Sequence, residues 1–224
     1  MLMRKLVVLC AVTLSTVGMV RAQRVYKPAS VLAGGTFYKI SVSEPGVYRI
    51  DLAFLGRLGI STSAIPSSSI QLFGNGGAML PESNSAPYTD DLIENPLLVV
   101  DGGDNTLNGS DYILFYASGP DRWITDSVNR QFSHQKNIYS DRSYYFLTIG
   151  NNGRRITEAV PPGNASITVN NFSGRYFHEL DSINFLNSGK EWFGEEFSNL
   201  PGRSLSRAFP VKMPGIIPGS TLTI

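Results

Sequence analysis

The sequence predicts an all-β protein of β-sandwich-like modules with one short helix, in which the second module is incomplete. Two observations lead to this fold class. Short stretches of alternating apolar and polar residues recur between turns rich in glycine and proline, and no long helical period is present. The 224 residues are 42% apolar, 11% aromatic and 17% charged, a composition that supplies a buried core and excludes a wholly disordered chain.

The first 22 residues have the pattern of a secretory signal peptide. Arg4 and Lys5 form a basic start, residues 6–20 are an apolar run, and small residues precede a cleavage position after Ala22. The run is shorter than the roughly 20 residues of a membrane-spanning helix. We therefore predict an exported protein whose mature chain begins after Ala22 and has no transmembrane span.

This leader also contains the chain's single cysteine, Cys10. Leu9 stands where a lipid-attachment signal requires a small residue, so an anchor on Cys10 is not expected. Cleavage excludes disulfides, thiolate zinc sites and a cysteine nucleophile from the remaining residues. It also reduces 19 basic residues to 16 against 18 acidic ones, a net charge of −2. Without a basic excess, nucleic-acid binding is not expected.

Residues 23–160 are predicted to form the first β-domain, which opens with two strands. Side chains in Thr36–Val42 alternate in character, as expected for a half-buried strand. Glu44-Pro45-Gly46 is a turn sequence, and Val47–Ile50 returns as a second strand. We therefore expect a β-hairpin over Thr36–Ile50.

A short helix is predicted directly after this pair of strands. Asp51 is suited to cap a helix over Leu52–Leu58, and Gly59 to end it in the left-handed conformation. The glycine-rich segments Gly74–Gly77 and Gly150–Gly153 are read as turns. The remaining strands of this domain are predicted at Ile70–Phe73, Leu97–Val100, Tyr112–Tyr116 and Tyr144–Ile149.

The second β-domain is predicted over residues 161–224. It follows Glu158–Ala165, a stretch rich in turn formers and poor in large side chains, which is typical of a domain junction. Because the sequence stops inside the last predicted strand, we expect this domain to be incomplete. Its strands are predicted at Ser166–Val169, Leu205–Met213 and Thr221–Ile224.

An acidic loop at residues 101–111 is a calcium candidate, because oxygen-bearing side chains follow one another at two-residue spacing around a glycine. The candidate ligands are Asp104, Thr106, Asn108 and Asp111. An EF-hand would require a glutamate at Phe115, so the match is partial. The alternative is an ordinary loop whose Asp and Asn side chains bond their own backbone. No other cofactor is expected.

Two further groups of residues are candidates for a functional site. Glu191 with Glu195 or Glu196, beside aromatic residues, has the composition of a glycosidase acid pair, or of a surface turn with an aromatic anchor. His134 and His178 have no second histidine or cysteine at metal-ligand spacing. We expect structural or surface roles for both histidines, and no catalytic residue is assigned.

Four segments, in order behind a signal peptide, carry a family resemblance: Tyr38–Ile60, Ile70–Glu82, Asp101–Trp123 and Phe177–Phe197. They resemble the amino-terminal region of the type IX secretion sortases of Bacteroidetes, which are gingipain-like cysteine peptidases. The resemblance implies an outer-membrane-associated, cell-surface endopeptidase that removes carboxy-terminal sorting domains from cargo.

In that family a Cys–His pair in a caspase-like α/β domain performs the cleavage, and this domain lies beyond the matched region. The resemblance therefore implies that the chain is a non-catalytic front region. Its expected partners are its own downstream peptidase domain, other secretion components and cargo. The alternative is a free-standing cell-surface module that binds a glycan or a protein.

Overall fold

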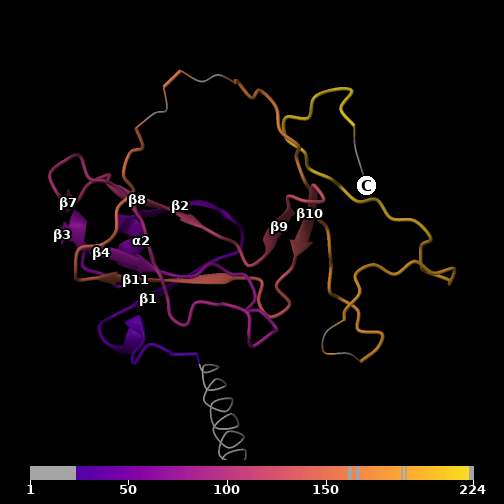
Figure 1. The fold of residues 1–224 in the computed structure, drawn as a ribbon, viewed down its shortest axis with the longest axis horizontal. Helices are drawn as coiled ribbons and strands as arrows, with labels where there is room; N and C mark the ends of the chain where they lie inside the picture. The colour runs from indigo at the N-terminus through magenta and orange to yellow at the C-terminus, as the bar shows by residue number, and fades with distance from the viewer. Residues whose placement is uncertain (1–23, 161–162, 165–166, 188, 190, 222–224) are drawn as a thin grey trace, which may run out of the picture.

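The computed structural model describes residues 24–160, 163–164, 167–187, 189 and 191–221. The predicted signal peptide, residues 1–22, lies outside the described residues. The fold is all-β, as predicted: antiparallel strands in several sheets accompany one short α-helix in the described residues. Figure 1 shows these sheets together, with a long coil, orange to yellow, outside them.

Two antiparallel sheets form the body of the molecule. The first has the order β1-β11-β4-β5, and the second has the order β2-β8-β6. Strands of the first sheet are β1 (Tyr38–Val42), β11 (Ser143–Ile149), β4 (Ile70–Phe73) and β5 (Glu94–Asn95). Strands of the second sheet are β2 (Gly46–Asp51), β8 (Tyr112–Ala117) and β6 (Leu98–Val100).

Smaller elements complete the fold. The helix α2 spans Leu52–Arg57, and short 3₁₀ turns lie at Val31–Ala33 and Ser67–Ser69. Two further strand pairs are β3 (Ile65–Pro66) with β7 (Thr106–Leu107), and β9 (Arg122–Asp126) with β10 (Gln131–Gln135). The β9–β10 hairpin lies to one side of the two main sheets (Figure 1).

The inner faces of the two main sheets share one apolar core. The rings of Phe115 on β8 and Tyr145 on β11 are 5.5 Å apart in an edge-to-face arrangement. The Ser118 backbone N–H donates to the Tyr145 hydroxyl at 2.8 Å, and burial raises the pKa of Tyr145. Other core residues are Val42, Ile50, Leu55, Ile70, Leu72, Leu97, Leu107, Ile113 and Leu147. This packing of two sheets is a β-sandwich.

The predicted hairpin over Thr36–Ile50 is wrong, although both of its strands exist. Strand β1 pairs with β11 and strand β2 pairs with β8, so the turn at residues 43–45 carries the chain from one sheet to the other. Val42 and Ile50 thereby both face the shared core, where each is at most 3% exposed. Burial in the sandwich therefore takes precedence over pairing between sequence neighbours.

The predicted helix is confirmed, one residue shorter than expected. The Phe54 backbone N–H donates to the Asp51 carboxylate at 2.8 Å, which satisfies an otherwise unpaired amide at the helix start. Leu55 points into the core. Gly59 has a φ of 82°, the left-handed conformation that favours glycine after a helix.

The strand predicted at Leu205–Met213 is wrong, since these residues are irregular. Of Ser166–Val169, the described residues Ile167–Val169 are also irregular, and Ser166 lies outside the described residues. Within residues 167–221 described by the structure, one isolated bridge joins Ile183 and Phe193. Of the last predicted strand, only Thr221 is described. Alternating residues form a strand only where a partner strand supplies hydrogen bonds.

Candidate functional site

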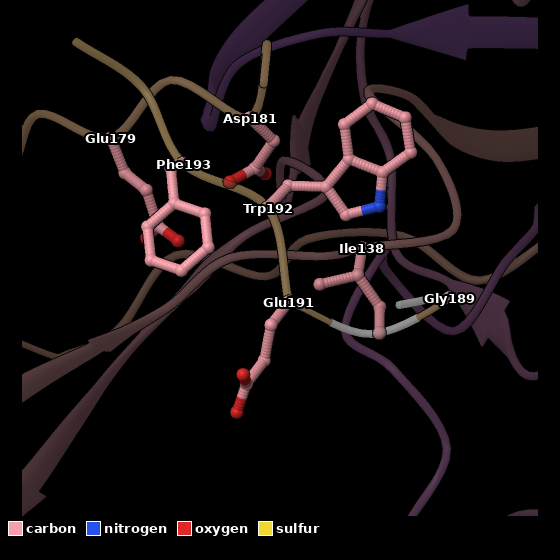
Figure 2. Close-up of a pocket in the computed structure, with 7 residues that line it drawn as sticks. All are labelled: Ile138, Glu179, Asp181, Gly189, Glu191, Trp192 and Phe193. Carbon is pink, nitrogen blue, oxygen red and sulfur yellow. The ribbon is translucent and has the colours of Figure 1, made fainter. Parts of the chain in front are cut away.

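A cavity of about 570 Å³ lies in the carboxyl-terminal part of the chain. Its lining residues are Ile138, Glu179, Asp181, Gly189, Glu191, Trp192 and Phe193. Figure 2 shows acidic side chains from two separate stretches beside an indole ring and a phenyl ring. The cavity therefore combines three carboxylates with an apolar wall.

The backbone pairing of Ile183 with Phe193 brings the two acidic stretches together. The Phe193 N–H donates to the Ile183 carbonyl at 2.7 Å, and the Ile183 N–H donates to the Phe193 carbonyl at 2.8 Å. The Ser182 hydroxyl adds a bond of 2.8 Å to the Gly194 carbonyl. A Cβ at Gly194 would lie 2.7 Å from the Leu180 carbonyl oxygen, so glycine is needed for this close approach.

Two side chains of β10, and Lys136 directly after it, hold residues 175–181 against the hairpin. The Arg175 guanidinium carbon lies 3.1 Å from the centroid of the Phe132 ring. Phe177 stacks on His134, and the Lys136 ammonium group contacts the Asp181 carboxylate at 2.5 Å and the Glu179 carbonyl oxygen at 3.2 Å. Phe132 and His134 are two residues apart in β10 and lie on the same face of the strand, and Lys136 follows directly after the strand.

His134 occupies a ring cluster rather than a metal site. Its imidazole stacks on Phe177 with centroids 3.8 Å apart and meets the Trp123 ring edge-on at 4.9 Å. Its Nε2 lies 3.9 Å from an Asp121 carboxylate oxygen. Among the described residues, no group of three or more His, Cys, Asp or Glu side chains is arranged to hold a metal ion.

The carboxylates named as a glycosidase pair lie in different surroundings. Glu191 lines the cavity, whereas Glu195 contacts His178 Nε2 at 2.6 Å and Glu196 contacts Arg203 at 2.9 Å. Neither Glu195 nor Glu196 lines the cavity. Residues Glu179 and Asp181 do line it, and sequence reasoning missed them as site residues.

The side chains that line this cavity determine which ligand groups it could bind. Trp192, 46% exposed, and Ile138 present apolar surface to a ligand, while the carboxylates accept hydrogen bonds and attract cations. Asp181 already binds the Lys136 ammonium group. The arrangement suits a ligand with an apolar or sugar-like face and donor groups, and the described residues around it include no histidine or cysteine nucleophile.

The acidic loop is folded by its own side chains. The Asp104 carboxylate accepts bonds of 2.8 Å from the Thr106 N–H and from the Asn108 side-chain amide. The Asp111 carboxylate accepts a bond of 2.8 Å from the Asn108 N–H. These are the local bonds expected for an ordinary loop. A calcium site of Asp104, Thr106, Asn108 and Asp111 stays a prediction.

The first residues that the structure describes, 24–31, are held by residues 86–91. Arg24 donates to the Ala86 carbonyl at 2.8 Å, and the Lys27 N–H donates to the Asp90 carboxylate at 2.8 Å. Asp91 accepts from the Ser30 hydroxyl and the Val31 N–H, and these bonds, led by that of Ser30, hold its pKa below the ordinary value.

No helix in the described residues is long and apolar enough to cross a membrane. No family model matches the chain, and no curated protein sequence matches it. Among solved structures, the chain is similar to dimeric latent PorU from Porphyromonas gingivalis, at 30% sequence identity and a TM-score of 0.45. The match covers 62% of this chain and 12% of the PorU chain. The resemblance predicted from the sequence is therefore confirmed, over a small part of the known protein.

Proposed function

We propose that this chain is the non-catalytic amino-terminal region of a cell-surface cysteine endopeptidase of the type IX secretion sortase kind. The observation that carries the proposal is the 30% identity to PorU over 62% of the chain. Since the match spans 12% of PorU, the activity, cargo and partners of the whole protein are part of the proposal. The cargo would be secreted proteins with carboxy-terminal sorting domains.

The carboxyl-terminal coil supports a role as part of a larger protein. Several large apolar side chains in residues 167–221 are more than half exposed, although burying each one would be worth about 1.5–3 kcal/mol. The most exposed of them are Ile167, Val169, Phe172, Phe185, Leu186, Leu200, Leu205 and Ile216. In a free-standing module this surface would favour aggregation, whereas further polypeptide would bury it.

The division of labour in this proposal follows from the residues present. After cleavage at Ala22 no cysteine remains in these residues, so the thiolate that attacks the scissile carbonyl comes from the downstream peptidase domain. The β-sandwich acts as a rigid platform for recognition loops. Export by the signal peptide and an outer-membrane-associated location complete the proposal.

The test begins with the gene sequence beyond the codon for Ile224. We expect the frame to continue into an α/β domain with a His and then a Cys. In the full-length protein, replacing that Cys with Ala should abolish removal of the sorting domain, whereas Glu191→Gln should leave at least half of the activity. A stop codon directly after Ile224 would overturn the proposal.

A second candidate, a binding module for a glycan or a protein, is favoured by the cavity beside Trp192. Ligand binding there should change Trp192 fluorescence, and Trp192→Phe should remove that change while leaving Trp123 as the internal reference. Glycans and cationic peptides are the probes to compare. No change with any of them would remove this candidate.

A further inference from the structure

The outer face of the β2-β8-β6 sheet is apolar, although it faces away from the core. We call it the outer apolar face and define it by Val47 on β2, Tyr112, Leu114 and Tyr116 on β8, and Leu98 and Val100 on β6. Val47 is 68% and Tyr116 is 60% exposed. Leu98 and Val100 are 40% and 37% exposed.

Strand register places these side chains in one continuous patch. Val47 is opposite Tyr116 across the β2–β8 pair. Leu98 is opposite Leu114, and Val100 is opposite Tyr112, across the β6–β8 pair. Directly opposed residues project from the same face of a sheet, with Cβ atoms about 5 Å apart. The patch therefore extends over all three strands.

Strand β8 has the composition of a strand covered on both sides. Ile113, Phe115 and Ala117 point into the core and are at most 1% exposed, whereas Tyr112, Leu114 and Tyr116 point outward. A strand with one solvated face normally carries polar residues there, and apolar residues on both faces are typical of strands buried on both sides.

The first sheet provides the internal contrast. On its outer face Lys39 and Ser41 of β1 are exposed, and the Lys39 ammonium group lies 3.8 Å from the centroid of the Tyr144 ring on β11. The same face also has Gln71 and Thr148, together with the aromatic residues Phe73 and Phe146. It therefore mixes polar and aromatic side chains, whereas the β2-β8-β6 face is apolar apart from Arg49 and Asp51.

A single cation lies within the outer apolar face among its described residues. Arg49 is opposite Leu114, and its guanidinium carbon lies 4.2 Å from the centroid of the Tyr112 ring. Asp51, at the end of β2, is engaged in capping α2. A partner surface that fits this face is therefore apolar, with a carboxylate positioned to meet Arg49.

The chain leaves the sandwich beside this same face. Leu97 bridges Arg155, and the Ile156 N–H donates to the Leu97 carbonyl at 2.9 Å, directly before Leu98 of the face. Arg155 fixes this exit by donating to the Ser67 carbonyl at 2.6 Å and the Ile70 carbonyl at 3.1 Å. Polypeptide that follows Ile156 thus starts next to β6.

We propose that a folded part of the same polypeptide, downstream of Ile224, docks on the outer apolar face. The inference rests on the proposed function, because the match to PorU leaves most of that chain outside the matched region. Docking removes the face from water and places the sandwich against the domain that it precedes. The contact is intramolecular, so the covalent link to the sandwich raises the effective concentration of the docking partner.

The test uses the full-length protein with the photo-cross-linker p-benzoylphenylalanine in place of Tyr116. The matched control has the same replacement at Tyr144, an exposed tyrosine on the outer face of the other sheet. A mixture of unlabelled and ¹⁵N-labelled copies separates contacts within one chain from contacts between copies. We expect Tyr116, but not Tyr144, to cross-link to peptides beyond residue 224 of the same copy.

Cross-links from position 116 to a second copy, to other proteins or to no downstream peptide would overturn the docking proposal. Hydroxyl-radical footprinting of the unmodified full-length protein gives an independent measurement, in which Tyr116 should be at least fivefold less oxidised than Tyr144. A reading frame that stops after Ile224 would instead defeat the proposed function. A frame that continues into a peptidase domain, without protection of Tyr116, would defeat the docking proposal alone.

Discussion

The Phe177 ring stacks on the His134 imidazole with centroids 3.8 Å apart and planes inclined by 25°. The two residues are far apart in sequence, since His134 belongs to β10 and Phe177 to the carboxyl-terminal coil. Trp123, opposite His134 across the hairpin, completes the cluster at 6.3 Å from Phe177. This stack joins the carboxyl-terminal coil to the β9–β10 hairpin. Phe177 lies two residues before Glu179, which lines the cavity.

Replacing Phe177 with Ala should loosen residues 175–181 from the hairpin. Aromatic pairs contribute about 0.5–1.5 kcal/mol to stability beyond the area they bury. We therefore expect the free energy of unfolding to fall by about 1 kcal/mol, and the emission of Trp123 to shift to the red because its ring loses a neighbour. The measurement is fluorescence in a Trp192→Phe background, with Phe172→Ala at an 87% exposed site as control. Equal effects of the two substitutions would contradict a specific stack.

Replacing Asp91 with Asn should destabilise the protein more at neutral pH than in acid. The folded-state pKa of Asp91 lies below its ordinary value of 3.8, mainly because the Ser30 hydroxyl bonds its carboxylate. Such a group stabilises the fold above the unfolded-state pKa, and the contribution is lost as pH falls through the folded-state pKa. Thermal melts at pH 7 and pH 3 should show a difference in melting temperature between the variant and the wild type that is smaller at the lower pH.

Asp141→Asn, at an exposed position, is the matched control for this titration. It should leave the melting temperature nearly unchanged at both values of pH. An Asp91→Asn difference of the same size at pH 7 and pH 3 would show that the charge of Asp91 is not what fastens residues 27–31.

Two glycine substitutions should have opposite effects on stability. A Cβ at Gly77 would lie 2.5 Å from Pro120 Cα and 2.6 Å from the Gly119 carbonyl oxygen, so Gly77→Ala should cost about 1–3 kcal/mol. Gly56 lies inside α2 with no atom within 4 Å of the added methyl group, so Gly56→Ala should stabilise by about 0.5–1 kcal/mol. Urea denaturation measures both, and a harmless Gly77→Ala would refute this packing.

Melting experiments on the acidic loop can distinguish its local folding from metal binding. Asp104→Ala removes the acceptor of the Thr106 N–H and the Asn108 amide. In EDTA, we expect this substitution to lower the free energy of unfolding by about 1 kcal/mol. Melting the wild-type protein in excess calcium tests the predicted ligands directly. A melting temperature that calcium leaves unchanged would remove the calcium hypothesis, whereas an unaffected Asp104→Ala variant would contradict the role of the local bonds.

Several local elements of residues 23–160 could be predicted from neighbouring residues alone. Strands were predicted at Ile70–Phe73 and Tyr112–Tyr116, which the structure has as β4 and β8. Asp51 identified the start of the helix, because a cap bonds an amide only three residues away. The β9–β10 hairpin was missed because its strands are mostly exposed and carry little apolar alternation.

The cavity was beyond sequence reasoning because its carboxylates come from separate stretches. Glu179 and Glu191 line one cavity because Ile183 pairs with Phe193, and the Lys136 contact with Asp181 depends on the position of β10. Glutamates close in sequence, such as Glu191 and Glu195, lie in different surroundings. Proximity along the chain was thus a poor guide to proximity in space.

The sequence by itself determined the all-β class, the capped helix and the resemblance to the sortase family, because side-chain alternation, caps and motifs are properties of adjacent residues. Only the tertiary structure decided that β1 pairs with β11 rather than β2, and that β8 is apolar on an uncovered face. Alternation states which face of a strand is apolar, but not which strand or domain covers it. That choice depends on burial summed over the whole fold, to which residues distant in sequence contribute.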